Sequence, residues 1–395
     1  MERRRENEIM IRRSLLALTM CCAGLLGAAV PPDAVLTDFP RLAGETDDAP
    51  RFRRAIAAAP NGVLAVGKGE YSIATPLVIT NRCSLEMHPA AHLVAVREMD
   101  FVLTWDGHDN YHALSVFNPD GSVYDNAGLF IRGGDIDGRG LASCLRIGNG
   151  HHFTLSNITL HNGRKAGLEL SRWNGGHLYE LVANNVYCKC TMKGLAGNIG
   201  VLVEVCDCHF TDVIVVDYTI GIKAGGSSNR FTRCHVWGGS VAPEGMSMRE
   251  WSDFYSANKK KRGKWDEKLE AALLAKGLPE MLRGSVCFDC ASGNTYDGCY
   301  ADTAEIGFNM PHGGRLTNCG FFNNPLMGLR KSTALVHKKG RLEIFGCSFS
   351  GPAGVEKLYE GPGTDVVWML STAGGGDGMD AAARRLANPS PANHP

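Results

Sequence analysis

Apolar residues in this chain alternate with polar ones over short segments, and corners rich in Asn, Gly and Asp separate the segments. The stretch Gly128 to Leu170 contains four alternating pairs, Leu129/Ile131, Phe153/Leu155, Ile158/Leu160 and Leu168/Leu170. Alternation with period two predicts β-strands, and this stretch has no apolar face with helical spacing. Strands this short bury a face only if similar units stack and share one core.

Such units do recur along the chain. A first element, apolar-x-x-small-x-apolar, occurs at Phe153–Ile158, Leu181–Val186, Phe210–Val215, Phe231–Val236, Tyr296–Ala301, Leu316–Phe321 and Ile344–Phe349. Successive copies start 28, 29, 21, 65, 20 and 28 residues apart. A second element, Gly-apolar-x-apolar or a close variant, follows most copies, at Gly167–Leu170, Gly200–Val203, Gly221–Ala224, Gly307–Met310 and Gly328–Lys331. This is the period of a parallel β-helix coil, and the spacing of 65 is one coil plus an insertion.

The segments outside these repeats predict other elements. Thr46 is the expected N-cap of a helix with Phe52, Ile56 and Ala59 on its apolar face, and four strands are expected after it, at Val63–Val66, Gly69–Ile73, Leu77–Ile79 and Ser84–Met87. Met99 to Asn126 predicts a long edge loop, and the insertion at 241–283 predicts an amphipathic helix. Val355 to Leu370 is expected to cap the stack, and the Gly- and Pro-rich residues 371–395 are expected to be disordered.

The first 29 residues predict a signal peptide. Arg12 and Arg13 precede the apolar run Ser14 to Leu26, and Gly27-Ala28-Ala29 offers a small-residue cleavage site. The run is too short to span a bilayer, and no other stretch qualifies. Lipidation at Cys21 or Cys22 is the less favoured alternative. We therefore expect a secreted or periplasmic protein without a membrane span, and a β-helix domain over residues 30–370.

Charge and cysteine usage narrow the classes of partner. The whole chain carries 41 basic and 41 acidic residues, five Arg and three Glu of them in the first 29 residues, which leaves a net charge near −2. This balance does not suggest a nucleic-acid or membrane partner. Cys234, Cys299, Cys319 and Cys347 share one repeat position, so they are expected to stack as an interior ladder, mostly of free thiols, with some disulfides as the alternative. Zinc binding at the C-x-C pairs is less favoured than packing.

A family resemblance supports the predicted fold. The segment TDDAPRFRRAIAAAPNGVLAVGKGEYSIATPLVI, residues 46–79, resembles the opening of the pectate-lyase-like superfamily, in the branch related to polygalacturonases. The segment GGDIDGRG at 133–140 resembles a turn found early in polygalacturonases, so Asp135 and Asp137 are expected to be structural. The resemblance covers roughly residues 38 to 350. It implies a single-stranded right-handed parallel β-helix (all-β) with an N-terminal capping helix and one helical insertion.

Candidate chemistry follows from the residues that should face outward. The middle residues of the second element should form one line across the strands, Glu169, Leu202, Lys223, Asn309 and Arg330. Asp217, Asp302 and Glu305 come just before those strands. For contacts with a glycan we expect Glu169 and Asn309 from this line, and Trp105, His108 and Trp237 from outside it.

Two reactions use such residues. Glycoside hydrolysis needs two carboxylates, for which Asp217 with Asp302 or Glu305 are candidates. β-Elimination of a uronate needs a base, for which Lys223, Arg330 and His235 are candidates, and Ca²⁺ belongs only to this alternative; otherwise no cofactor is expected. The polygalacturonase motifs N-T-D, D-D, G-H-G and R-I-K are not matched, so no catalytic residue is carried over from that family.

The sequence thus predicts an exported carbohydrate-active enzyme that cleaves glycosidic bonds of a polysaccharide, with hydrolysis favoured over elimination. A non-catalytic glycan-binding or structural β-helix is the rival class. Side-by-side association of coils into a homotrimer is left open.

Overall fold

The computed structural model describes residues 32–106, 129–148, 150–171, 178–192, 195, 197–238, 275, 284–291, 293–323, 332–349, 355–361, 365–369 and 372–373. The predicted signal peptide and most of the predicted tail and helical insertion lie outside these residues.

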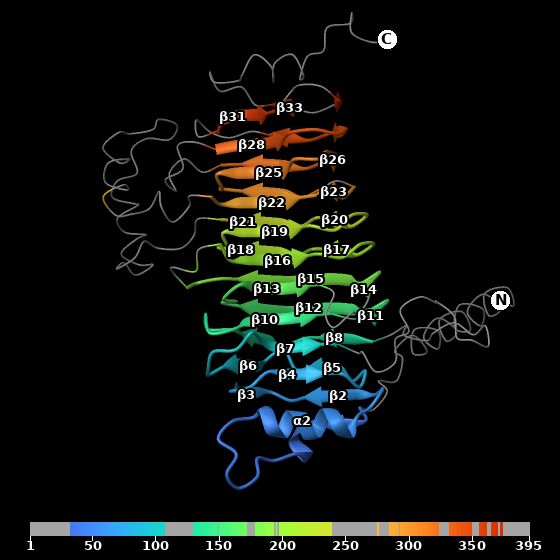
Figure 1. Cartoon of the computed structure of the whole chain (residues 1–395), viewed down its shortest axis with the longest axis vertical. Helices are drawn as coiled ribbons and strands as arrows, with labels where there is room; N and C mark the ends of the chain where they lie inside the picture. Colours follow the sequence, from blue (N-terminus) through green and yellow to red (C-terminus); the bar gives the residue numbers. More distant parts are fainter. Residues whose placement is uncertain are drawn as a thin grey trace, which may run out of the picture.

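The chain winds into a column of stacked coils with three strand-bearing faces (Figure 1). All strand pairs are parallel, and each strand pairs with the equivalent strand one coil further on. The structure therefore confirms the predicted parallel β-helix. Figure 1 shows helix α2 at the end of the column formed by the first coils.

The first face contains one strand from each coil. Its strands are β1 (Ala34–Val35), β2 (Val63–Val66), β5 (Ser84–Met87), β8 (Phe130–Arg132), the first halves of β12 (Thr154–His161) and β15 (Val182–Lys189), β17 (His209–Thr211), β20 (Arg230–Thr232), β23 (Thr295–Asp297), β26 (Gly314–Thr317), β29 (Leu342–Phe345) and β32 (Val366–Met369).

The second face follows after a corner. Its strands are β3 (Gly69–Ile73), β6 (Ala91–Ala95), β9 (Asp135–Asp137), the second halves of β12 and β15, β18 (Ile214–Val216), β21 (His235–Trp237), β24 (Tyr300–Asp302), β27 (Gly320–Phe322), β30 (Ser348–Phe349) and β33 (Thr372–Ala373).

The third face is a separate ten-stranded sheet. It consists of β4 (Leu77–Ile79), β7 (Phe101–Trp105), β10 (Ser143–Ile147), β13 (Ala166–Leu170), β16 (Ile199–Val203), β19 (Ile220–Ala224), β22 (Val286–Cys290), β25 (Ile306–Met310), β28 (Ser332–His337) and β31 (Val355–Glu360). A small pair, β11 (Gly150–His151) with β14 (Leu178–Tyr179), lies outside these faces.

The corner between the first and second faces turns on one residue in the left-handed region. Positive φ values occur there at Asn157, Asn185, Asp212, Arg233, Gly298, Asn318 and Gly346. Asn, Asp and Gly adopt this conformation at the lowest cost, which explains the Asn-, Asp- and Gly-rich corners of the sequence. The strands that flank each corner bury alternate residues.

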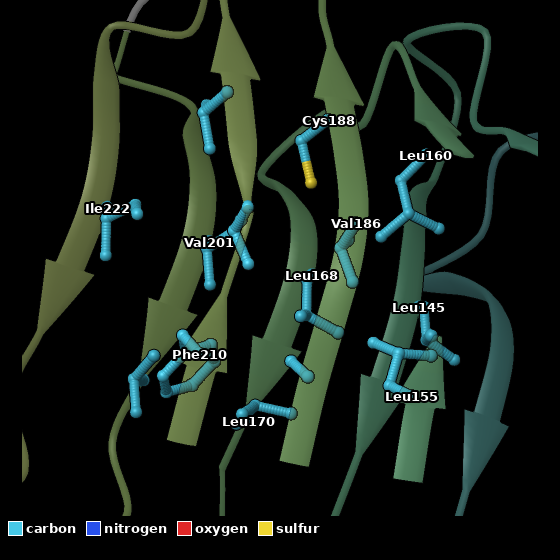
Figure 2. Close-up of a cluster of buried hydrophobic side chains, with 14 of the residues drawn as sticks. Leu145, Leu155, Leu160, Leu168, Leu170, Val186, Cys188, Val201, Phe210 and Ile222 are labelled. Atoms are coloured by element: carbon cyan, nitrogen blue, oxygen red, sulfur yellow. The ribbon is translucent and has the colours of Figure 1, made fainter. Parts of the chain in front are cut away.

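The interior is filled by side chains that stack from coil to coil. Phe231 lies between Phe210 and Tyr296, with ring centroids 4.7 and 4.9 Å away, and Phe288 stacks on Phe308 at 4.8 Å. Figure 2 shows part of the core, in which aliphatic side chains of neighbouring coils line up. Ladders of like residues arise because each coil repeats the same inward positions about 4.8 Å further along the axis.

The predicted thiol ladder is present. Cys234, Cys299, Cys319 and Cys347 are buried in successive coils, and the backbone N–H of Cys319 lies 3.4 Å from the Cys347 sulfur. All twelve cysteines of the described chain are free, so the alternative of disulfides is not realised.

The N-terminal helix differs from the prediction at its start. Helix α2 runs from Ala49 to Ala58, so Thr46 is not its N-cap, and the side chain of Asp47 accepts the N–H of Ala49 at 2.8 Å. The buried Asp48 instead accepts hydrogen bonds from Arg41 and from the N–H of Ser72. These bonds fasten the helix to the first coil. The 3-10 turn η1 (Leu36–Asp38) precedes it.

Two predictions, one on register and one on the end of the stack, were wrong. The structure pairs Phe210 with Ala183, two residues after the predicted partner Leu181. A slip of two residues keeps every side chain on the same face, so alternation could not detect it. Residues Val355 to Leu370 do not form a cap, because β31 and β32 add strands to the third and first faces.

Candidate active site on the second face

Four side chains from two adjacent coils meet on the outer surface of the second face. The register of β21 and β24 places His235 opposite Tyr300 and Trp237 opposite Asp302. The central residue of each strand is buried, so its two neighbours project outward. We call these four residues the Asp302 cluster. The sequence predicted three of them and missed Tyr300, whose outward parity in β24 was the available signal.

Asp302 is a half-buried carboxylic acid. Burial raises its pKa above the ordinary value of 3.8, while a hydrogen bond from Thr303 and the nearby His235 act in the opposite direction. The Thr303 hydroxyl donates to Asp302 Oδ1 at 2.6 Å. No Lys or Arg of the described chain forms an ion pair with this carboxyl group. Asp302 is thus poised to hold a proton at higher pH than an exposed aspartate.

His235 is the neutral neighbour of this acid. Burial lowers its pKa below the ordinary 6.5, and Asp302 only partly opposes that effect. Its Nε2 atom is buried and has no hydrogen-bond partner in the described structure. The His235 ring lies 5.1 Å from the ring of Tyr300.

Apolar surface surrounds the acid. Trp237 is 39% exposed, Tyr300 37% and Ile214, on the preceding coil, 38%. Side chains of this size are normally covered, and exposed aromatic rings offer flat apolar faces beside a polar atom. The Asp302 cluster therefore combines a protonatable carboxyl group with a surface that suits the apolar face of a sugar ring.

Asp217 lies on the same side of the column. It directly follows Val216, which is two rungs from Asp302 on one line of the ladder, Val216–Trp237–Asp302. Two rungs correspond to about 9.6 Å between backbones. Asp217 has a positive φ of 63°, and its N–H bonds the carbonyl of Trp237 at 2.9 Å. It is a corner residue whose carboxylate follows this line by one position.

Glu305 has a structural role instead. Its carboxylate accepts the N–H of Gly284, and its own N–H donates to Ser285 Oγ at 3.0 Å. Gly284 and Ser285 begin the segment in which the described chain rejoins the coils before β22. These bonds hold that segment against the coil, so the Glu305 carboxylate has a structural partner.

A second set of polar residues lies on the third face. Strand registers align Arg146, Glu169, Leu202, Lys223, Asp289 and Asn309 on one outward line, which we call the third-face line. Arg146 Nε is 3.0 Å from Glu169 Oε1, and Asn309 Nδ2 donates to Asp289 Oδ1 at 2.8 Å. Lys223 forms no ion pair or hydrogen bond within the described chain.

The sequence predicted Glu169, Leu202, Lys223 and Asn309 on this line but missed Arg146 and Asp289. Their strands carry Cys144 and Cys287 where the others carry glycine, so the search for Gly-apolar-x-apolar passed over them. A search for the apolar-x-apolar triplet alone finds both.

Three predicted site residues do not belong to a described site. Trp105 is 1% exposed, and its indole N–H donates to the carbonyl of Cys83 at 3.0 Å, so it is a core residue of β7 and not part of a loop. His108 lies outside the described residues. Arg330 does too, and the predicted strand Gly328–Lys331 was misplaced, because β28 puts Val336 beside Asn309.

The GGDIDGRG segment contains a further charged cluster. Asp137 accepts the N–H of Arg139 at 2.8 Å, as expected of a structural turn. The buried Asp135, however, faces two histidines, with His161 Nδ1 at 3.2 Å and His92 Nδ1 at 3.9 Å. Burial raises its pKa, and the two histidines oppose this. Among the described residues, no group of three or more His, Cys, Asp or Glu has a geometry that could hold a metal ion.

No family model and no curated protein sequence matches the chain. Among solved structures it is similar to the endo-xylogalacturonan hydrolase from Aspergillus tubingensis, with a TM-score of 0.56 and 13% identity over 88% of this chain and 94% of that one. It is also similar to the enzymatically active domain of tailspike protein 2 of bacteriophage CBA120 (TM-score 0.55, 10% identity, 86% of this chain and 47% of that one). A third is ORF18 of Geobacillus virus E2 (TM-score 0.54, 12% identity, 86% and 61%).

The chain therefore spans less than two thirds of the two viral chains. Identities this low establish the fold alone. That fold is a parallel β-helix, as the sequence predicted. No helix of the described chain is long and apolar enough to cross a membrane.

Proposed function

We propose that this protein is an exported carbohydrate-active enzyme that hydrolyses glycosidic bonds of a polysaccharide at the Asp302 cluster. The observation that carries the proposal is a carboxylic acid with a raised pKa beside exposed aromatic rings. In this proposal Asp302 is the general acid that protonates the leaving oxygen, and Trp237 and Tyr300 bind the sugar rings.

The second carboxylate of the proposal is Asp217. Hydrolysis with inversion places a water between an acid and a base about 6.5–9.5 Å apart. Asp217 directly follows Val216, whose backbone lies about 9.6 Å from that of Asp302, and side chains that lean toward each other would bring the two carboxyl groups into that range. Asp217 would act as the base that activates the water.

β-Elimination is the second candidate, because Lys223 has no ion-pair partner in the described chain and could take a proton from the carbon next to a uronate carboxyl group. Any Ca²⁺ requirement belongs to this alternative. The similarity of the fold to the Aspergillus hydrolase supports hydrolysis by analogy only. Export, and any association into a trimer, stay predictions from the sequence.

The test is to incubate the protein with a panel of plant, algal and host polysaccharides, reading new reducing ends and the ultraviolet absorbance of unsaturated uronates. We expect reducing ends without absorbance, and Asp302→Asn should lower kcat by about 10²- to 10⁴-fold. The matched control is Asp38→Asn, at an exposed aspartate of η1. Absorbance lost with Lys223→Ala would support elimination, and no product from folded protein would favour a binding protein.

A further inference from the structure

The charge pattern around the Asp302 cluster limits the sugars that it can accept. On the second face, the coil before the cluster presents Ile214, with Val216 buried beside it, and the coil after it presents Gly320 and Phe322. None of these residues is charged. The outward residues of these four adjacent described coils thus contribute one carboxylic acid, a neutral imidazole and apolar groups.

The nearest described cations are either distant or already paired. On the line that contains Trp237 and Asp302, the first cation is Lys189, two rungs from Trp237 and three from Asp302. Arg233, at the neighbouring corner, forms two hydrogen bonds with Asp212, at 2.8 and 2.6 Å. Its charge is therefore compensated by a partner on the preceding coil.

A uronate would be disfavoured at this place. Proteins bind sugar carboxylates with Arg or Lys, through charge-assisted hydrogen bonds. Here a substrate carboxylate would lie against a partly buried apolar surface, which opposes its charge, and it would meet the negative charge of Asp302 whenever that group is ionised. The apolar faces of neutral rings can instead pack on Trp237 and Tyr300.

We infer that the Asp302 cluster binds neutral sugar residues and rejects uronates. The inference rests on the proposed function, in that it names the substrate class of the same site. It also separates this site from the third-face line, where Lys223 provides a cation that has no ion-pair partner in the described chain.

The test compares polymers that differ only in charge. Polygalacturonate and alginate are each paired with their carboxyl-reduced forms, in which every carboxylate has become a primary alcohol on the same backbone. Binding to the four polymers is measured by affinity electrophoresis in the cold, where turnover is slow, and initial rates are measured separately. We expect at least tenfold tighter binding of a neutral polymer than of its charged parent.

Three variants make the test specific. Trp237→Ala should weaken binding of the neutral polymer at least tenfold, while Val182→Ala, at a side chain 42% exposed on the first face, should leave it unchanged. Asp302→Asn should narrow the difference between neutral and charged polymers, because it removes the repelling carboxylate.

The outcomes separate this inference from the proposed function. If neutral polymers bind through Trp237 but are never cleaved, the inference is supported and hydrolysis is contradicted. If the uronans bind more tightly and are cleaved, the protein is an enzyme but the inference is overturned. No binding of either neutral polymer would also overturn it.

Discussion

Asp302 and Trp105 show how far single residues can be interpreted before the fold is known. Both were candidates for a glycan site on residue type and position. The coil arrangement puts Trp105 in the core, where its N–H bonds Cys83, and puts Asp302 on the surface between Trp237 and the next coil. Residue type alone does not separate these cases, because burial depends on the strand boundaries around each residue.

At the residue scale, Asp302→Asn is expected to raise thermal stability as well as lower turnover. Because the pKa of Asp302 is raised in the folded protein, the folded state binds this proton more tightly than the unfolded state. The contribution of Asp302 to stability is therefore greatest below its ordinary pKa of 3.8 and declines as the pH rises through the raised value. Asn does not titrate, so the variant avoids that decline.

The check is the melting temperature of the wild type and the variant between pH 3.5 and 7.5. The difference should be smallest at acid pH and should grow in favour of the variant toward neutral pH. A variant that melts lower than the wild type at every pH would show that Asp302 is held mainly by bonds to its ionised form.

Several strands of the third face need a glycine at their second position, in addition to alternating apolar residues. Several begin with an outward aliphatic residue followed by glycine, as in Ile199-Gly200 and Ile220-Gly221. A Cβ at Gly200 would lie 2.1 Å from Val215 and 2.7 Å from the carbonyl of Gly221. The glycine that marks the repeat in the sequence is thus needed because the second face packs directly against it.

At the element scale, Gly200→Ala should destabilise the protein by about 1–3 kcal/mol, since the neighbouring coils must move apart to admit the methyl group. Gly67→Ala is the matched control, because no atom lies within 4 Å of its added Cβ. Urea unfolding measures both free energies. Equal effects at the two positions would mean that the loss comes from backbone freedom and not from the close approach.

The whole molecule is held together by its stacked interior and not by covalent cross-links. All twelve cysteines of the described chain are free, and all but Cys206 are buried. Burial raises the pKa of Cys83 and Cys208 to about 12, which keeps these thiols protonated and unreactive at neutral pH. A chain of this size does not need disulfides when its core is continuous.

At the scale of the whole molecule, a thiol reagent at pH 8 should label about one cysteine, Cys206, in a folded chain that lacks residues 1–29, and all twelve after unfolding. A reductant should leave the melting temperature unchanged. A fall of several degrees on reduction, with fewer than twelve reactive thiols in denaturant, would contradict the free-thiol ladder.

The sequence by itself determined the coil. Period-two alternation and the recurrence of both elements predicted the solenoid, with an Asn, Asp or Gly at most corners. The strands from Val63 to Met87 were predicted at their observed bounds. These features are local, because strand parity and corner conformation depend on residues a few positions apart.

Only the tertiary structure decided which coils' residues become neighbours. The register between coils pairs Phe210 with Ala183 and not with Leu181, and it places Val336 and not Arg330 beside Asn309. The same register brings Arg146 and Asp289 onto the third-face line. A shift of two residues leaves the alternation of buried and exposed side chains unchanged, so alternation does not select the register. The packing of large side chains selects it, as where Phe231 stacks between Phe210 and Tyr296. The candidate site, which exists only between adjacent coils, is defined by that selection.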